Sequence, residues 1–296
     1  MSEQIDQLGS ITGEQEFFKA VSEDLKQSLV LFLCERGHGK SSSLKAIIKY
    51  CKETNSDIIV KCFDPSMSWY EISPTKYRQY VSTEKLTAGM IDNVGDCTYE
   101  IGSLTEEQRR FFLGTCIAQD YKYRYNLRLN DPAAFKKLPW VIYVIEESNT
   151  IFGSFSFRKN DAITPVLQDF VSIGRNYKMN AFLVATAEEG ELSPSLRRRS
   201  RRIYGRLVAE GDIARVRKSN KAMANYLSND IPRFSFVYWG SKFYGPTHIN
   251  DTVKCTPEDY VVLNPAPVKA AGYNWDWLIW GVIVGFTVWT IIGYIF

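Results

Sequence analysis

Short runs of apolar residues alternate along this chain with longer segments in which apolar residues recur at helical spacing. The short runs predict buried strands and the longer segments predict amphipathic helices. Strands are expected at residues 29–33, 56–63, 97–101, 140–147, 180–186, 203–208, 234–239 and 242–249. Helices are expected within residues 1–26 and at 42–50, 104–129, 161–177 and 211–226, with a short one beginning at Pro194. This alternation predicts an α/β fold with a mostly parallel sheet and helices on both faces.

The first predicted strand leads into the turn CERGHGKSS, which precedes the helix at residues 42–50. Strand, glycine turn, Lys-Ser and helix are the components of a phosphate-binding loop. Glycine lets the backbone approach a phosphate closely, and the unpaired amides of a helix N-terminus favour an anion. In such a loop Lys40 reaches the β- and γ-phosphates and Ser41 ligates Mg²⁺. The residues assigned to nucleotide binding are Gly37, His38, Gly39, Lys40, Ser41 and Ser42.

One position of the turn departs from the pattern G-x-x-x-x-G-K-[ST]. Cys34 stands where the leading glycine is expected. On the loop alone, a plain glycine turn between a strand and a helix is the alternative interpretation.

Two adjacent carboxylates end the apolar run WVIYVIEE at residues 140–147. In phosphate-loop ATPases a strand that ends this way lies beside the loop. We therefore assign Glu146 to the Mg²⁺ shell and Glu147 to the general base that orients the attacking water. A buried strand that ends in a solvated acidic turn is the alternative.

Composition excludes several other classes of site. The 296-residue chain can hold one sizeable α/β domain with appendages, and its formal net charge of +3 does not by itself imply a polyanionic partner. Two histidines far apart and six scattered cysteines without a C-x-x-C pair argue against a zinc site and against a disulfide framework. The polar start MSEQIDQLGS is unlike a signal peptide, so we expect the thiols to be in a reducing compartment.

Residues 278–296, LIWGVIVGFTVWTIIGYIF, contain no charged side chain. A helix of this length just crosses a hydrocarbon core of about 30 Å, and tryptophans near its start with Tyr294 near its end suit the two interfaces. We therefore expect a single-pass C-terminal tail anchor with the catalytic domain on the cytoplasmic side. A buried or partner-binding helix is the alternative.

The expected organisation has four parts. They are an N-terminal helical extension at residues 1–26, a P-loop ATPase domain at 27–250, a linker at 251–274 that contains three prolines and Gly272, and a transmembrane anchor at 275–296.

Three segments together resemble the HerA/FtsK branch of P-loop ATPases: CERGHGKSS, VIYVIEESNTIF and SIGRNYKMNAFLVATAEEGELSPSLRRRSRRIYGRL. Within that branch the chain looks most like the genome-packaging ATPases of membrane-containing icosahedral viruses, notably archaeal ones. The resemblance spans roughly residues 28–250. It implies the P-loop NTPase (RecA/ASCE-like) fold, ATP and Mg²⁺ as cofactors, and a homo-oligomeric ring, a hexamer, that translocates double-stranded DNA.

The resemblance also implies roles for individual residues. Lys40 and Ser41 take the loop roles, Glu146 the metal-shell role and Glu147 the catalytic role. Arg175 falls where the family often has an arginine that reaches into the neighbouring subunit's site. A solvated helix C-terminus is the other interpretation of Arg175. The sensor strand usually ends in Thr-Gln in this family, whereas this chain has Thr186 followed by an alanine.

A basic cluster follows that strand, with three interpretations. In the first, the cluster faces a pore and binds DNA phosphates. In the second, it supplies the arginine finger. In the third, it forms the solvated face of a helix near an acidic neighbour or anionic lipid. Its members are Arg197, Arg198, Arg199, Arg201 and Arg202.

These observations lead to one principal functional hypothesis and two alternatives. The principal one is a membrane-anchored motor that uses ATP hydrolysis to move viral DNA into a capsid with an internal membrane, with capsid or portal proteins as partners. The alternatives are a zonula-occludens-toxin-like assembly or extrusion ATPase of a filamentous virus, and a membrane-anchored structural virion protein that binds nucleotide without hydrolysing it.

Overall fold

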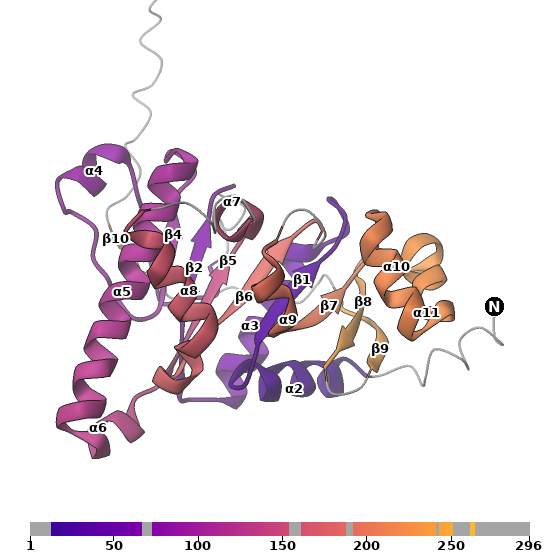
Figure 1. The fold of residues 1–296 in the computed structure, drawn as a ribbon, viewed down its shortest axis with the longest axis horizontal. Coiled ribbons are helices and arrows are strands. Elements are labelled where there is room, and N and C mark those ends of the chain that lie inside the picture. The colour runs from indigo at the N-terminus through magenta and orange to yellow at the C-terminus, as the bar shows by residue number, and fades with distance from the viewer. Residues whose placement is uncertain are drawn as a thin grey trace, which may run out of the picture. The chain divides into compact units, whose positions relative to one another are not determined.

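The computed structural model describes residues 13–66, 73–153, 161–187, 192–240, 243–250 and 261–263. Within these ranges one ten-stranded sheet has the order β10-β3-β4-β2-β5-β6-β1-β7-β8-β9 (Figure 1). The strands are β1 Leu29–Leu33, β2 Ile58–Asp64, β3 Tyr77–Tyr80, β4 Cys97–Glu100, β5 Trp140–Ile145, β6 Met179–Ala185, β7 Ser200–Tyr204, β8 Ser235–Trp239, β9 Phe243–His248 and β10 Val261–Leu263. Neighbouring strands are parallel from β10 to β7, and the two pairings at the other edge, β7–β8 and β8–β9, are antiparallel.

Helices cover both faces of the sheet, as the sequence predicts (Figure 1). The α-helices are α2 Glu14–Leu25, α3 Lys40–Thr54, α4 Thr83–Thr87, α5 Glu106–Asn130, α6 Pro132–Lys137, α7 Ser148–Phe152, α8 Ile163–Ile173, α9 Pro194–Arg198, α10 Glu210–Ser219 and α11 Lys221–Asn225. Two short turns of other helical types follow α8 and α11, namely η2 Gly174–Tyr177 and η3 Tyr226–Asp230.

The buried strand β1 separates two hydrophobic cores. Its alternate side chains point to opposite faces, with Leu31 in one core and Phe32 in the other. Helices α5, α7 and α8 pack on the Leu31 side, and α2 and α3 pack on the Phe32 side. Because both faces are covered, all five residues of β1 are buried, which explains why the strand reads as a continuous apolar run rather than an alternating one.

The order of the central strands determines where a site can form. The chain leaves β1 through α3 and forms β2 three positions along the sheet, with β5 and β6 inserted between them. All four strands are parallel, so their carboxyl ends meet at one edge. The phosphate-loop sequence and the paired carboxylates both follow strands that end there, and this edge is where open α/β sheets bind ligands.

Helix α5 is fastened across the sheet by polar contacts as well as by its apolar face. Thr105 and Gln108 form a reciprocal capping box at its N-terminus. Near its other end the buried Arg124 donates hydrogen bonds to main-chain carbonyls of Tyr177, Lys178 and Pro139. The Arg124 bonds fix that end of α5 against the residues that precede β5 and β6.

The structure differs from the sequence-based expectations in several places. The strand expected at residues 203–208 begins at Ser200, so Arg201 and Arg202 lie within β7, paired beside Val30 and Leu31 of β1. The helix expected at 211–226 is interrupted at Asn220, whose side chain caps α11 by accepting from the Met223 amide. Strand β3 and helices α4, α6 and α7 were not expected.

The C-terminal expectations fall mostly outside the described residues. Three residues of the segment expected as a linker, Val261–Leu263, form edge strand β10 beside β3. The predicted anchor at 275–296 lies outside the described residues. In the ranges that are described, no helix has the length and apolar character needed to cross a membrane.

Candidate functional site

The turn between β1 and α3 has the backbone of a phosphate-binding loop. Gly37 and Gly39 both have positive φ, 79° and 94°, which side chains of L-residues rarely adopt. A Cβ at Gly39 would also overlap the ring of Phe234. Helix α3 then begins at Lys40, so its first amide groups open toward the carboxyl edge of the sheet.

Cys34, at the position that departs from the loop pattern, is fully buried. Its sulfur occupies the space that a Cβ atom at Gly205 would need, and Gly205 directly follows the neighbouring strand β7. Burial raises the pKa of the Cys34 thiol to about 12, so the group stays protonated and acts as a packing group. The extra side chain in the loop is therefore accommodated by a glycine on the adjacent strand.

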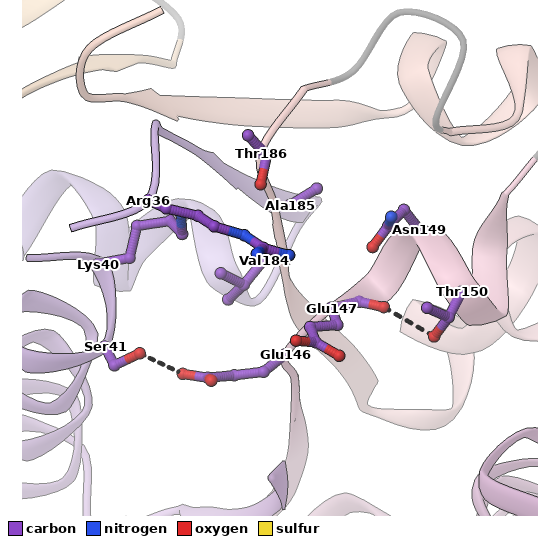
Figure 2. A pocket seen from close by; sticks show the side chains of 10 residues that line it. All are labelled: Arg36, Lys40, Ser41, Glu146, Glu147, Asn149, Thr150, Val184, Ala185 and Thr186. Carbon is purple, nitrogen blue, oxygen red and sulfur yellow. Dashed lines mark hydrogen bonds between the residues drawn. The ribbon is translucent and has the colours of Figure 1, made fainter. Parts of the chain in front are cut away.

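The loop is joined directly to the end of β5. The Ser41 hydroxyl donates a hydrogen bond of 2.7 Å to Glu146 Oε1 (Figure 2). The Lys40 ammonium donates to the carbonyl oxygens of Cys34 at 2.5 Å and Glu35 at 3.2 Å, which places it inside the curve of the loop. Residues 105 positions apart in sequence thus meet at one point, as the sequence analysis predicts.

Glu147 follows Glu146 in a strained backbone conformation. Its φ of 50° and ψ of 42° are left-handed, which is uncommon for a residue other than glycine, and helix α7 begins immediately after it. The side chain is 49% exposed and its Oε2 lies 3.9 Å from Arg109 Nη1. The backbone reversal turns the Glu147 carboxylate away from the buried strand and into solvent-accessible space.

These groups surround a cavity of about 410 Å³ (Figure 2). Three chain segments form its wall: the loop with the start of α3, the end of β5 with α7, and the end of β6. The lining residues are Arg36, Lys40, Ser41, Glu146, Glu147, Asn149, Thr150, Val184, Ala185 and Thr186. The wall therefore carries cations on the loop side and carboxylates at the end of β5.

The donor set suits a Mg²⁺ ion that is shared with a nucleotide. Ser41 and Glu146 supply hydroxyl and carboxylate oxygens, the hard ligands that Mg²⁺ prefers. Among the described residues no group of three or more His, Cys, Asp or Glu side chains could hold a metal ion. The remaining ligands would thus be phosphate oxygens and water, which is how Mg²⁺ is bound in most nucleotide sites.

Four residues assigned to the nucleotide from sequence are not among those that line the cavity: Gly37, His38, Gly39 and Ser42. The ring of His38 is buried and packs edge-to-face on Phe236, 5.8 Å between ring centroids. Burial lowers the pKa of His38, so its imidazole is neutral at pH 7.

Arg175 and the basic cluster lie away from this cavity. Arg175 is in η2, before the amino end of β6, whereas Thr186 follows its carboxyl end. With Arg199 it lines a second cavity of about 200 Å³. The two strand arginines are engaged by their own chain: Arg201 donates to Gly240 O and Arg202 donates to Ser200 O and Arg197 O.

Sequence reasoning missed several residues at the cavity. Arg36 could have been found from its place inside the loop motif, and Asn149 and Thr150 from their position just after the paired carboxylates. Arg109 carries no such signal, because α5 reaches Glu147 only through the packing of the fold.

Comparison with known proteins identifies the fold. No family model matches the chain, and no curated protein matches it. The genome-packaging NTPase B204 from Sulfolobus turreted icosahedral virus 2, solved with ATP-gammaS, matches at a TM-score of 0.50 and 13% identity, over 75% of this chain and 98% of that one. VirB4 of Thermoanaerobacter pseudethanolicus matches at a TM-score of 0.50 and 11% identity, over 75% and 89% of the two chains. These neighbours are HerA/FtsK-type P-loop ATPases, and this chain shares their fold.

Proposed function

We propose that this chain binds Mg-ATP in the cavity between the loop and β5, hydrolyses it, and uses the energy to move double-stranded DNA. The observation that carries the proposal is the 2.7 Å hydrogen bond from Ser41 to Glu146. It brings the two halves of a phosphate-loop ATPase site together at the end of the sheet where ligands bind. The packaging NTPase among the structural neighbours supports a motor over other uses of this fold.

Each side chain has a definite task in this mechanism. The amides at the start of α3 and the Lys40 ammonium hold the phosphates. Ser41 and Glu146 would hold Mg²⁺, which when bound neutralises charge on the phosphate oxygens. Glu147 accepts a proton from the attacking water, and its exposed position beside the cavity leaves room for that water.

Translocation requires contacts beyond this cavity. We assign a homo-oligomeric ring in which Arg175 reaches the site of the neighbouring subunit, because within its own chain it lies at the opposite end of β6. Arg198 and Arg199 are exposed, whereas Arg201 and Arg202 are half-buried within β7, so the first two are better placed to meet DNA phosphates. Arg199 Nη1 also donates to Ser172 O. Membrane anchoring through residues 275–296 and docking to a capsid complete the proposal.

The proposal is tested by ATP hydrolysis of the full-length chain, purified in detergent, with and without double-stranded DNA. We expect DNA-stimulated activity. The Lys40→Ala and Glu147→Gln variants should each lose about 10²- to 10⁴-fold in kcat. Lys49→Ala and Glu53→Gln are matched controls, since both residues lie on α3 outside the cavity. A parent protein that binds ATP without hydrolysing it would overturn the motor and favour a structural role.

A further inference from the structure

The two cations that line the cavity differ in how they are engaged. Lys40 donates to two carbonyl oxygens of its own loop. Arg36 lines the same cavity and forms no hydrogen bond or ion pair with any residue in the described part of the chain. Figure 2 shows its side chain extending from the loop into the cavity, toward the side where β5 and β6 end. Its guanidinium donors are therefore available to a ligand.

The backbone that carries Arg36 is held on both sides. On one side, the Glu35 amide donates to Arg206 O at 2.9 Å and the Glu35 carboxylate lies 3.4 Å from Arg206 Nε. On the other, the loop passes Gly39, which lies against the Phe234 ring, and the Phe234 amide donates to His38 O at 3.1 Å. The side chain of Arg36 thus starts from a fixed point, which lowers the entropy lost when it binds a ligand.

The wall formed by the ends of β5 and β6 favours an additional cation beside the terminal phosphate of bound ATP. Glu146 and Glu147 already place two carboxylates at the cavity, and the end of β6 contributes a single hydroxyl, Thr186. The terminal phosphate of ATP adds further negative charge beside them. A guanidinium offers a planar fork of donors that matches phosphate oxygens, so one arginine can both neutralise and orient that group.

We propose that Arg36 binds the terminal phosphate of ATP from within its own chain and so makes this site distinguish ATP from ADP. This inference rests on the proposed function. It differs from the role assigned to Arg175, which needs a neighbouring subunit. Because Arg36 belongs to the loop that holds the phosphates, its effect is present in a single subunit and does not depend on protein concentration.

The test is equilibrium binding of ATP-gammaS and ADP, each with Mg²⁺, to the full-length chain and its variants. Arg36→Gln should weaken ATP-gammaS binding by about 10- to 100-fold, the range of a charge-assisted hydrogen-bonded pair, and ADP binding by less than about threefold. Arg36→Lys should recover part of the loss, because it keeps the charge without the fork. Arg217→Gln removes the same charge from exposed α10 and should leave the ratio of the two affinities unchanged.

The outcomes separate the two proposals. If the parent binds and hydrolyses ATP but Arg36→Gln has the parent's ratio of affinities, the inference about Arg36 is wrong and the proposed function stands. Equal weakening of both nucleotides would also contradict it, since Arg36 would then support the loop rather than the terminal phosphate. If the parent binds neither nucleotide, both proposals fail.

Discussion

The sulfur of Cys34 fills the space that a side chain at Gly205 would need. A Cβ built on Gly205 would overlap Cys34 Sγ and lie 3.0 Å from the Cys34 Cβ. The two residues directly follow the neighbouring parallel strands β1 and β7, and the Gly205 amide donates to Leu33 O at 2.9 Å. The unusual cysteine of the phosphate loop and this glycine therefore form a complementary pair.

This pairing predicts how substitutions combine. Gly205→Ala should lower the free energy of unfolding by about 1–3 kcal/mol, the usual cost of overpacking a buried site. Adding Cys34→Gly removes the overlapping atoms, so the double variant should be more stable than Gly205→Ala alone. Denaturant unfolding of the parent, the two single variants and the double variant measures this coupling. Strictly additive effects would show that the two positions do not share the space.

The buried thiols predict a loss of stability at alkaline pH. Burial raises the pKa of Cys34 to about 12, Cys51 to about 11 and Cys116 to about 12. In the unfolded chain these thiols ionise near 9.0, so above that pH the unfolded state holds fewer protons than the native state. Stability should be complete below about pH 9 and decrease between about pH 9 and about pH 12.

Urea midpoints across this pH range provide the measurement. Cys116→Ala should give a shallower decrease, because one contributing thiol is removed. Rapid labelling of these thiols in the native protein at neutral pH would contradict their burial.

Hydrolysis should require Mg²⁺, and the apparent affinity for Mg²⁺ should depend on the Ser41–Glu146 pair. Chelation is expected to abolish activity. Ser41→Ala and Glu146→Gln should each raise the Mg²⁺ concentration for half-maximal hydrolysis by about 10- to 100-fold, as loss of a metal-site group does elsewhere. Glu53→Gln, remote from the cavity, should behave as the parent. A Mg²⁺ dependence unchanged in both variants would place the metal elsewhere.

The exposed Arg198 and Arg199, at the C-terminal end of α9, predict a change in the salt dependence of DNA binding. Each phosphate neutralised contributes about 0.9 to the slope of log affinity against log salt. Arg198→Gln with Arg199→Gln should therefore make the slope less steep by about 2. The control is Arg217→Gln with Lys218→Gln, which removes equal charge from the last turn of α10. If both pairs change the slope equally, binding has no preference for α9.

Local signals predicted many elements because their causes are local. Five consecutive apolar residues at Leu29–Leu33 suit a strand buried on both faces, and Thr105 with Gln108 caps α5 within one turn. The same locality explains the errors. Arg201 and Arg202 look like part of a solvated basic segment, yet they occupy β7 because pairing with β1 decides strand position there.

By itself the sequence determined the α/β alternation, the glycine loop before α3 and the two acids after β5, because each depends on residues close together in the chain. Only the tertiary structure decided the sheet order β5-β6-β1, which brings Glu146 to Ser41, the meeting of Cys34 with Gly205, and the approach of Arg109 to Glu147. Those relationships follow from which strands pair and how α5 packs. The strand pairing and helix packing minimise the exposed apolar surface of the whole domain, so no single sequence position indicates them.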